Sequence, residues 1–270
     1  MVKKEGTTTM SYREITKPIG LGTICREIEA TCRRAQLYKR CGLRPEHLIL
    51  PLDPGCGRTV LLEYMTAMYK EAGVLNFSSG LDDMLEIVFD GTLPQLKDAF
   101  AAIRDAAVYA NEYCGLIGMD ISELALHLGE TQVAEFLKRC RQVCDHACVV
   151  FFLSAHPSRS EERLLDKLCE SVDHVKRLEV EPYTAGEMLD LVVKLVEERG
   201  VEVRNSAAFH AMLEELQAEF FTDFREAPAA ADVLVRYADF SGFTPILDEH
   251  GLKTMLADRH GHVAERSEVK

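Results

Sequence analysis

The stretch that decides the fold is Leu48-Ile49-Leu50-Pro51-Leu52-Asp53-Pro54-Gly55-Cys56-Gly57-Arg58-Thr59-Val60-Leu61-Leu62. It begins with a short apolar run, which is typical of a buried strand. Glycines and prolines follow, and residues 59–72 then repeat apolar side chains at helical spacing. The stretch therefore predicts a strand, a glycine-rich turn and a helix in direct succession.

The turn is similar to a phosphate-binding loop, GxxxxGK(S/T), with two positions changed. In the intact motif, backbone N–H groups surround the phosphates, the lysine adds a charge and the hydroxyl binds Mg²⁺. Here Gly55, Gly57 and Thr59 remain, but Leu52 replaces the first glycine and Arg58 the lysine. The planar guanidinium does not fit the space of an ammonium. Two interpretations stay open: weak nucleotide binding, or a tight turn without a ligand.

Composition sets the class of protein. The chain has 270 residues, of which 47% are hydrophobic, enough for one larger domain with a smaller attachment. No apolar run approaches the roughly 20 residues of a membrane span, and residues 1–16 are polar, so we expect a cytoplasmic protein. Nine cysteines scattered through the chain indicate free thiols.

Charge bears on the partner. The net charge of −13 argues against general nucleic-acid binding, which needs a concentrated basic surface. One local basic region precedes the glycine turn: Arg26, Arg33, Arg34, Lys39, Arg40 and Arg44. We favour a solvated helix face there, and a surface for an acidic partner or nucleic acid is the alternative.

Alternating patterns predict an α/β fold, a parallel sheet with helices on both faces, followed by a small all-helical lid. Apolar runs predict strands over 48–52, 115–119, 147–153 and 174–180, and 81–88 is ambiguous. Helical spacing occurs over 23–41, 59–72, 93–111, 133–144 and 160–169, and in the lid over 185–199, 206–220 and 229–237. We expect a polar tail (1–16), an α/β domain (17–181), a lid (182–240) and a partly disordered extension (241–270).

An α/β unit carrying Gly55-Cys56-Gly57-Arg58-Thr59, with a helical domain after Pro182-Tyr183-Thr184, resembles the AAA+ ATPases among the P-loop NTPases. Within that family it is most similar to the CbxX/CfqX and stage V sporulation branch, over about residues 17–237. The resemblance implies ATP or ADP with Mg²⁺ as the ligand. It places Thr59 and Asp120 at the metal. It offers these positions for nucleotide contact: Ile19, Gly20, Pro54, Gly55, Cys56, Gly57, Arg58, Thr59 and Val60.

The catalytic positions of the family are altered in this chain. The acidic motif after the second strand keeps Asp120 but has Ile121 where a glutamate orients the attacking water, leaving Glu123 as a displaced candidate. Ser154 corresponds to the residue that senses the γ-phosphate. Residues 168–172 contain no arginine where the family has its arginine finger. Only Arg225 or Arg236 is available for the lid arginine.

Three functions are compatible with this pattern. The first is an AAA+-like nucleotide-binding protein that lacks ATPase activity and acts as a regulatory or scaffolding subunit. The second is an atypical Mg-ATPase that uses Arg58, Asp120 and Glu123 to remodel a protein partner. The third is a protein-interaction module that binds no nucleotide. In each, we expect a protein partner or an AAA+-type homo- or hetero-oligomer, without membrane or nucleic-acid binding.

Two cysteine features have alternative interpretations. Cys140, Cys144 and Cys148 recur every four residues, which favours small buried side chains over a metal site, because metal knuckles use closer pairs. Cys56 lies at the start of a predicted helix, where a thiol can become reactive.

Overall fold

The computed structural model describes residues 17–75, 84–87, 101, 105, 115–204, 206–220 and 224–267. The chain divides into two compact units, Met1–Glu181 and Pro182–Lys270. The tail predicted for 1–16 lies outside the described residues, as does nearly all of the helix predicted for 93–111. No helix in the described ranges is long and apolar enough to cross a membrane.

The first unit contains a parallel sheet of five strands in the order β2-β3-β4-β1-β5, which confirms the predicted α/β class. The strands are β1 (His47–Pro51), β2 (Met84–Ile87), β3 (Leu116–Asp120), β4 (Cys148–Leu153) and β5 (Val175–Arg177). Asp120 pairs with Phe152, and Pro51 with Leu153. The carboxyl ends of β3, β4 and β1 therefore meet at one edge.

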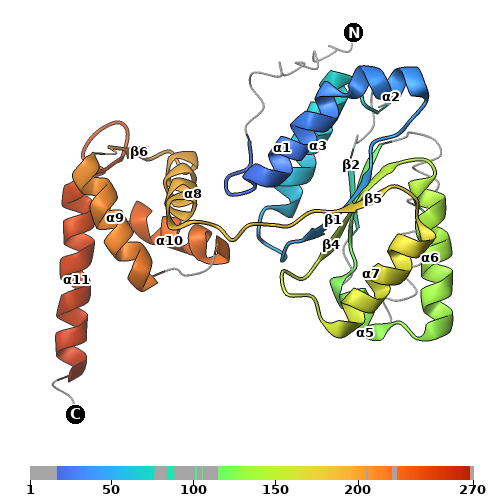
Figure 1. The fold of residues 1–270 in the computed structure, drawn as a ribbon. Helices are drawn as coiled ribbons and strands as arrows, with labels where there is room; N and C mark the ends of the chain where they lie inside the picture. Colours follow the sequence, from blue (N-terminus) through green and yellow to red (C-terminus); the bar gives the residue numbers. More distant parts are fainter. Residues whose placement is uncertain are drawn as a thin grey trace, which may run out of the picture. The chain divides into compact units, whose positions relative to one another are not determined.

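Helices cover both faces of the sheet (Figure 1). They are α1 (Gly22–Arg33), α2 (Ala35–Cys41), α3 (Arg58–Ala72), α5 (Ser122–His127), α6 (Glu130–Cys144) and α7 (Arg159–Ser171). Helices α1 and α3 lie on one side, and α5, α6 and α7 on the other. The single helix predicted over 23–41 is wrong, because the chain turns at Arg34. Arg34 is the C-cap of α1 with ψ near 2°, and its amide donates to both the Ala30 and the Thr31 carbonyls.

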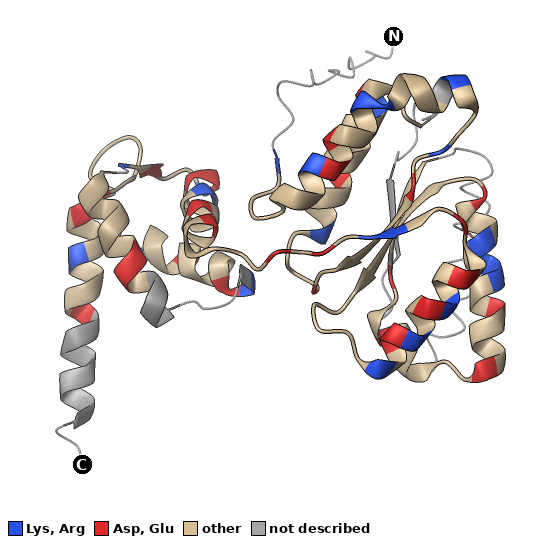
Figure 2. Ribbon diagram, viewed as in Figure 1, with Lys and Arg blue, Asp and Glu red and all other residues tan. Residues whose placement is uncertain are grey.

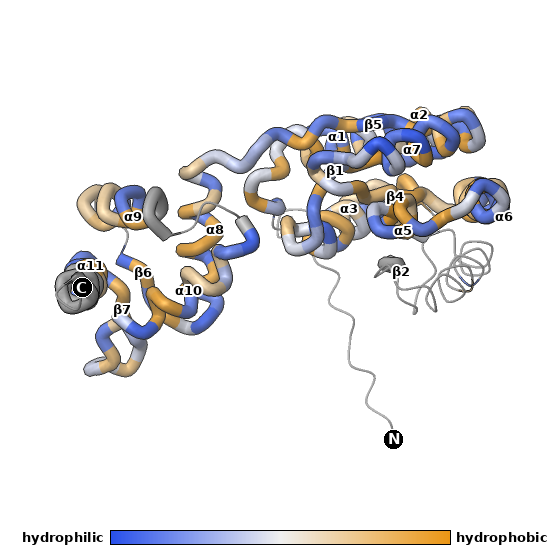
Figure 3. The backbone as a smooth tube through the Cα atoms, turned by 90° about the horizontal axis from the view of Figure 1, so that it is seen from below, coloured by the Kyte–Doolittle hydropathy of each residue, from blue (hydrophilic) through white to orange (hydrophobic). Residues whose placement is uncertain are grey.

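The central strands are buried on both faces, as continuous apolar runs in a parallel sheet require. All six residues of β4 are buried, and the strand is hydrophobic along its length (Figure 3). Charged residues instead lie mostly on the surrounding helices and loops, and on β5 at one edge of the sheet (Figure 2). Gly118 in β3 lets α3 approach closely, because a Cβ there would lie 2.3 Å from Leu62 Cδ1. This contact fixes the helix that follows the glycine turn.

The second unit is mainly helical, as predicted for the lid. It contains α8 (Ala185–Glu198), α9 (Ala207–Phe220), the 3₁₀ turn η2 (Phe224–Glu226), α10 (Ala227–Val235) and α11 (Glu249–Ser267). Thr184 begins α8 with a capping box: its hydroxyl accepts from the Glu187 amide at 3.2 Å, and the Glu187 carboxylate accepts from the Thr184 amide at 2.8 Å.

The stretch expected as a C-terminal extension contributes to the core of this second unit. Leu247, Leu252 and Met255 are buried there beside Phe209 and Leu213. A short parallel pair, β6 (Glu202–Val203) with β7 (Ile246–Leu247), was not predicted from the sequence. The domain bounds given by the sequence stay a prediction.

Candidate functional site

The glycine turn, Asp120 and Ser154 come together at the carboxyl edge of the sheet, because each follows or ends one of three adjacent strands. Gly55 and Gly57 have φ values of 82° and 86°. This left-handed conformation favours glycine and turns the chain directly into α3. Gly57 is the N-cap of α3, and no side chain caps the helix.

Arg58 turns into the protein. The whole residue is only 5% exposed to solvent, and its guanidinium forms an ion pair with Asp120. Nε donates to the Leu52 carbonyl at 2.6 Å and Nη2 to the Leu153 carbonyl at 3.2 Å. The guanidinium also lies 5.1 Å from the centre of the Phe152 ring. Arg58 therefore joins the glycine turn to the ends of β3 and β4.

Asp120 has partners on both carboxylate oxygens. Oδ2 accepts from Arg58, while Oδ1 accepts from the Ser122 hydroxyl at 2.6 Å and the Ser122 amide at 3.1 Å. Asp120 is 4% exposed. A cation at this carboxylate would compete with these donors and with the charge of Arg58.

Ser154 is held in a similar way by Glu161, a residue that the sequence analysis did not single out. Its hydroxyl donates to Glu161 Oε1 at 2.7 Å, and its amide donates to the same oxygen at 3.0 Å. The Ser158 amide donates to Oε2 at 2.7 Å. Burial raises the pKa of Glu161, but these hydrogen bonds outweigh it and lower the pKa below its usual value. The Ser158-x-x-Glu161 capping-box spacing was the available signal.

Asp53 in the glycine turn completes the network at this edge. Its Oδ1 accepts from the Ala155 amide at 2.9 Å, which ties the turn to the loop after β4. Polar groups from the three strand ends thus bond mainly to one another.

Solved structures with the same arrangement of elements identify the fold. Domain III of the replication initiation protein DnaA from Thermotoga maritima has a TM-score of 0.53 and 16% identity, covering 94% of this chain and 97% of that one. A RuvB variant from Thermotoga maritima has a TM-score of 0.52 and 16% identity, covering 88% and 70%. A structure describing katanin self-assembly has a TM-score of 0.53 and 17% identity, covering 87% and 76%. These proteins are AAA+ ATPases.

The chain has the AAA+ fold. No model of a protein family matches the sequence, and no curated protein matches it significantly. Identities of 16–17% carry the fold alone, so the resemblance to the CbxX/CfqX and stage V sporulation branch stays a prediction.

The remaining positions predicted for nucleotide contact differ in exposure. Ile19 and Gly20 are half-buried, and Gly20 lines a hollow of only about 10 Å³, room for about one water. Pro54, Gly55, Thr59 and Val60 are exposed in the turn and first helical residues, and Cys56 is buried. Their roles in binding stay predictions, as does the reactivity of Cys56.

The other catalytic candidates do not converge on the turn through any described contact. Glu123 is exposed in the first turn of α5. Ile121, at the position of the family's glutamate, is fully buried. Arg177, near the position of the missing arginine finger, pairs with Glu162 through two contacts of 3.0 Å. In the second unit, Arg225 and Arg236 are exposed.

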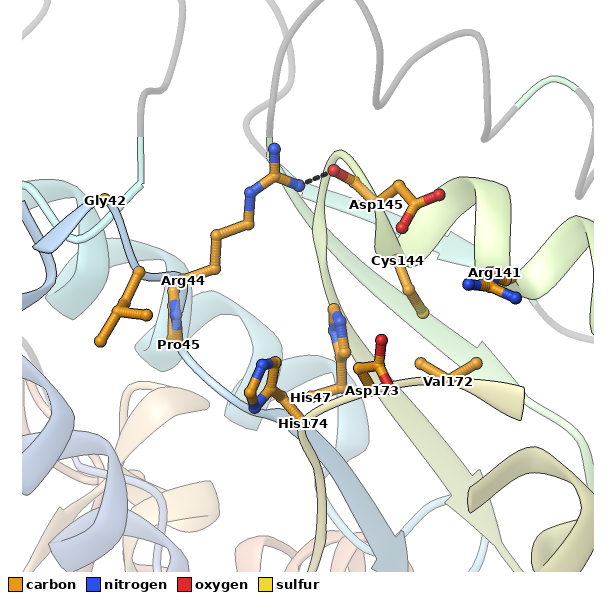
Figure 4. Close-up of a pocket in the computed structure, with 11 residues that line it drawn as sticks. Gly42, Arg44, Pro45, His47, Arg141, Cys144, Asp145, Val172, Asp173 and His174 are labelled. Carbon is orange, nitrogen blue, oxygen red and sulfur yellow. Dashed lines mark hydrogen bonds between the residues drawn. The ribbon is translucent and has the colours of Figure 1, made fainter. Parts of the chain in front are cut away.

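A separate polar hollow of about 280 Å³ lies at the amino edge of the sheet (Figure 4). His47 lines it and is buried, with Nδ1 accepting from the Val149 amide at 3.1 Å. Burial, with smaller contributions from Arg44 and His174, lowers the pKa of His47 to about 4. Its neutral ring therefore carries the proton on Nε2. Arg44 donates to the Asp145 carbonyl at the end of α6 and so caps that helix.

The three regularly spaced cysteines are buried. Burial raises the pKa of Cys148 to about 12 and raises those of Cys140 and Cys144 above their usual range. The eight cysteines within the described ranges are free thiols.

Proposed function

We propose that this protein is an AAA+-like regulatory or scaffolding subunit that does not hydrolyse ATP. The ion pair between Arg58 and Asp120 is the observation that carries this proposal. The residue that replaces the phosphate-binding lysine occupies the carboxylate expected to support Mg²⁺. Neither side chain is then available for its family role.

The pair makes Mg²⁺-nucleotide binding costly. Removing one partner of a buried ion pair commonly costs about 3–5 kcal/mol, because the other charge is left uncompensated. Opening this pair for a metal nucleotide would reduce affinity by about 100-fold to several thousand-fold if the full cost were paid. The donor set at Asp120 therefore does not fit Mg²⁺ without rearrangement.

Other groups that AAA+ ATPases use for hydrolysis are also missing or engaged elsewhere. Ile121 provides no base for a water molecule, and Ser154 is bonded to Glu161. Residues 168–172 contain no arginine. In other phosphoryl-transfer proteins an arginine finger raises the catalytic rate by roughly 10³–10⁵-fold. Each of these changes disfavours ATP hydrolysis.

Weak binding of ATP or ADP without Mg²⁺ is compatible with the same geometry. The backbone from Gly55 to Thr59 keeps the turn into a helix N-terminus, where N–H groups favour an anion. Such binding would act as a conformational signal. The katanin structure concerns self-assembly, and we extend to this chain the proposal of an AAA+-type homo- or hetero-oligomer or another protein partner.

Phosphate release at millimolar ATP with Mg²⁺ tests the proposal. We expect the wild-type protein to release no more phosphate than the Asp120→Asn variant. Turnover that this substitution abolishes would instead establish an atypical ATPase.

A further inference from the structure

The polar hollow at the amino edge of the sheet contains a buried hydrogen-bond donor whose acceptor is not supplied by the described residues. This donor belongs to His47, which is 5% exposed and lines the hollow (Figure 4). The neutral ring accepts from the Val149 amide through Nδ1, so Nε2 carries the proton. No described residue accepts a hydrogen bond from Nε2. Within the described ranges, Thr66 Oγ1 is the one unpaired side-chain atom that is sealed from solvent, so Nε2 opens into the hollow.

The other buried residues of this hollow are apolar. Pro45, Cys144 and Val172 line it beside His47. Burial raises the pKa of the Cys144 thiol far above its usual range, so the thiol is neutral. No cluster of three metal-binding side chains occurs among the described residues. One donor set in apolar walls suits a single oxygen of an organic molecule, because a fully hydrated ion would lose its water there without equivalent partners.

The charged and titratable groups of the hollow lie at its exposed rim. They are Arg44, Arg141, Asp145, Asp173 and His174. Burial has the largest effect on the pKa of His47 and lowers it, Arg44 and His174 lower it further, and Asp145 opposes them with a smaller effect. The charge balance at the buried ring is therefore positive. This balance favours a ligand whose acceptor atom carries a negative charge.

Arg141 supplies a second donor to the same hollow. It lies in the last turn of α6, and within the described ranges its guanidinium forms no hydrogen bond or ion pair. Arg44 differs, since it already donates to the Asp145 carbonyl. A guanidinium presents paired N–H groups that match the two oxygens of a carboxylate. The hollow therefore combines a buried neutral donor with a guanidinium at its rim that has no described partner.

We propose that the polar hollow binds a small organic carboxylate. One carboxylate oxygen accepts from His47 Nε2, the other accepts from Arg141, and the carbon body lies against Pro45 and Val172. The volume of about 280 Å³ is near the lower end of the usual range of about 300–1,000 Å³ for ligand pockets, which suits a molecule of a few carbons. The hollow lies at the opposite end of β1 from the glycine turn, so this inference does not depend on nucleotide binding.

Nitrogen NMR of the full chain with isotope-labelled histidine tests the site during titration with sodium butyrate in Tris buffer at neutral pH. The signals of His47 are assigned by their loss in His47→Asn, whose side-chain oxygen can still accept from the Val149 amide. Arg141→Gln removes the second donor at an exposed position, so folding should be retained. Lys138→Gln is the matched control, because Lys138 is exposed on α6 and does not line the hollow. Butyramide and inorganic phosphate are titrated in parallel.

We expect butyrate to shift the His47 Nε2 signal saturably at millimolar concentration in wild type and in the control. Arg141→Gln should bind butyrate at least about tenfold more weakly, as expected for loss of a hydrogen bond to a charged group. Unmoved His47 signals at tens of millimolar butyrate would overturn the inference. So would equal affinity in Arg141→Gln. An equal response to butyramide would show that no carboxylate is required, and an equal response to phosphate would show that no organic body is required; either result would also overturn it.

Discussion

Arg58, the first residue of α3, and Asp120, the last residue of β3, form a buried ion pair across the carboxyl edge of the sheet. The two residues lie 62 positions apart in sequence. Their pairing joins the glycine turn to the end of β3, at the edge where the proposed function places nucleotide. Stability and nucleotide affinity should therefore depend on the same contact.

A double-mutant cycle at this pair should show strong coupling. Arg58→Met or Asp120→Leu alone should lower the free energy of unfolding by about 3–5 kcal/mol, because each leaves a buried charge unpaired. The double variant should lose less than the sum by about 0.5–3 kcal/mol. Urea denaturation at pH 7 measures all four proteins. Additive losses would show that the pair is not coupled.

Stability should fall in mild acid because of His47. The folded protein holds this base neutral with a pKa of about 4, while an unfolded histidine titrates near pH 6.5. The unfolded state therefore binds more protons between these values, so the contribution is present above about pH 6.5 and is lost as the pH falls toward 4. The loss should reach about 3 kcal/mol.

Urea denaturation at several pH values measures this loss, with His47→Gln as the comparison. The variant should have a flatter dependence between pH 6.5 and 4, since carboxylates elsewhere are the same in both proteins. An identical slope in the two proteins would refute the assignment to His47.

Gly118→Ala should destabilise the first unit by about 1–3 kcal/mol through overpacking against buried Leu62. Gly186→Ala in α8 is the control, since its added Cβ meets nothing within 4 Å. That control should be neutral or slightly stabilising. Chemical denaturation compares them, and a Gly118→Ala protein as stable as wild type would contradict the close contact.

Much of the first unit could be predicted because its strands are continuous apolar runs beside helices of regular spacing. The turn at Arg34 was missed, since both sides of it keep helical composition. Strands β6 and β7 were missed because each has only two residues, too few to show an alternating pattern.

The site could be predicted only in part. The sequence identified Arg58 as an altered motif position and Asp120 as a retained one. The resemblance assigned nucleotide to Arg58 and Mg²⁺ to Asp120. Their mutual contact depends on adjacency of β1, β4 and β3, which spacing along the chain does not reveal. The bond from Ser154 to Glu161 was within reach, because the capping-box spacing of Ser158 and Glu161 fixes where that carboxylate lies.

Calorimetric titration of wild type and Arg58→Lys with ATP, each with and without Mg²⁺, tests the central claim most directly. We predict weak binding or none by wild type, with no gain from Mg²⁺. Arg58→Lys, which frees Asp120, should bind Mg²⁺-ATP at least about tenfold more tightly than wild type, a difference of about 1.4 kcal/mol. Tight Mg²⁺-dependent binding by wild type that the substitution weakens would contradict the claim.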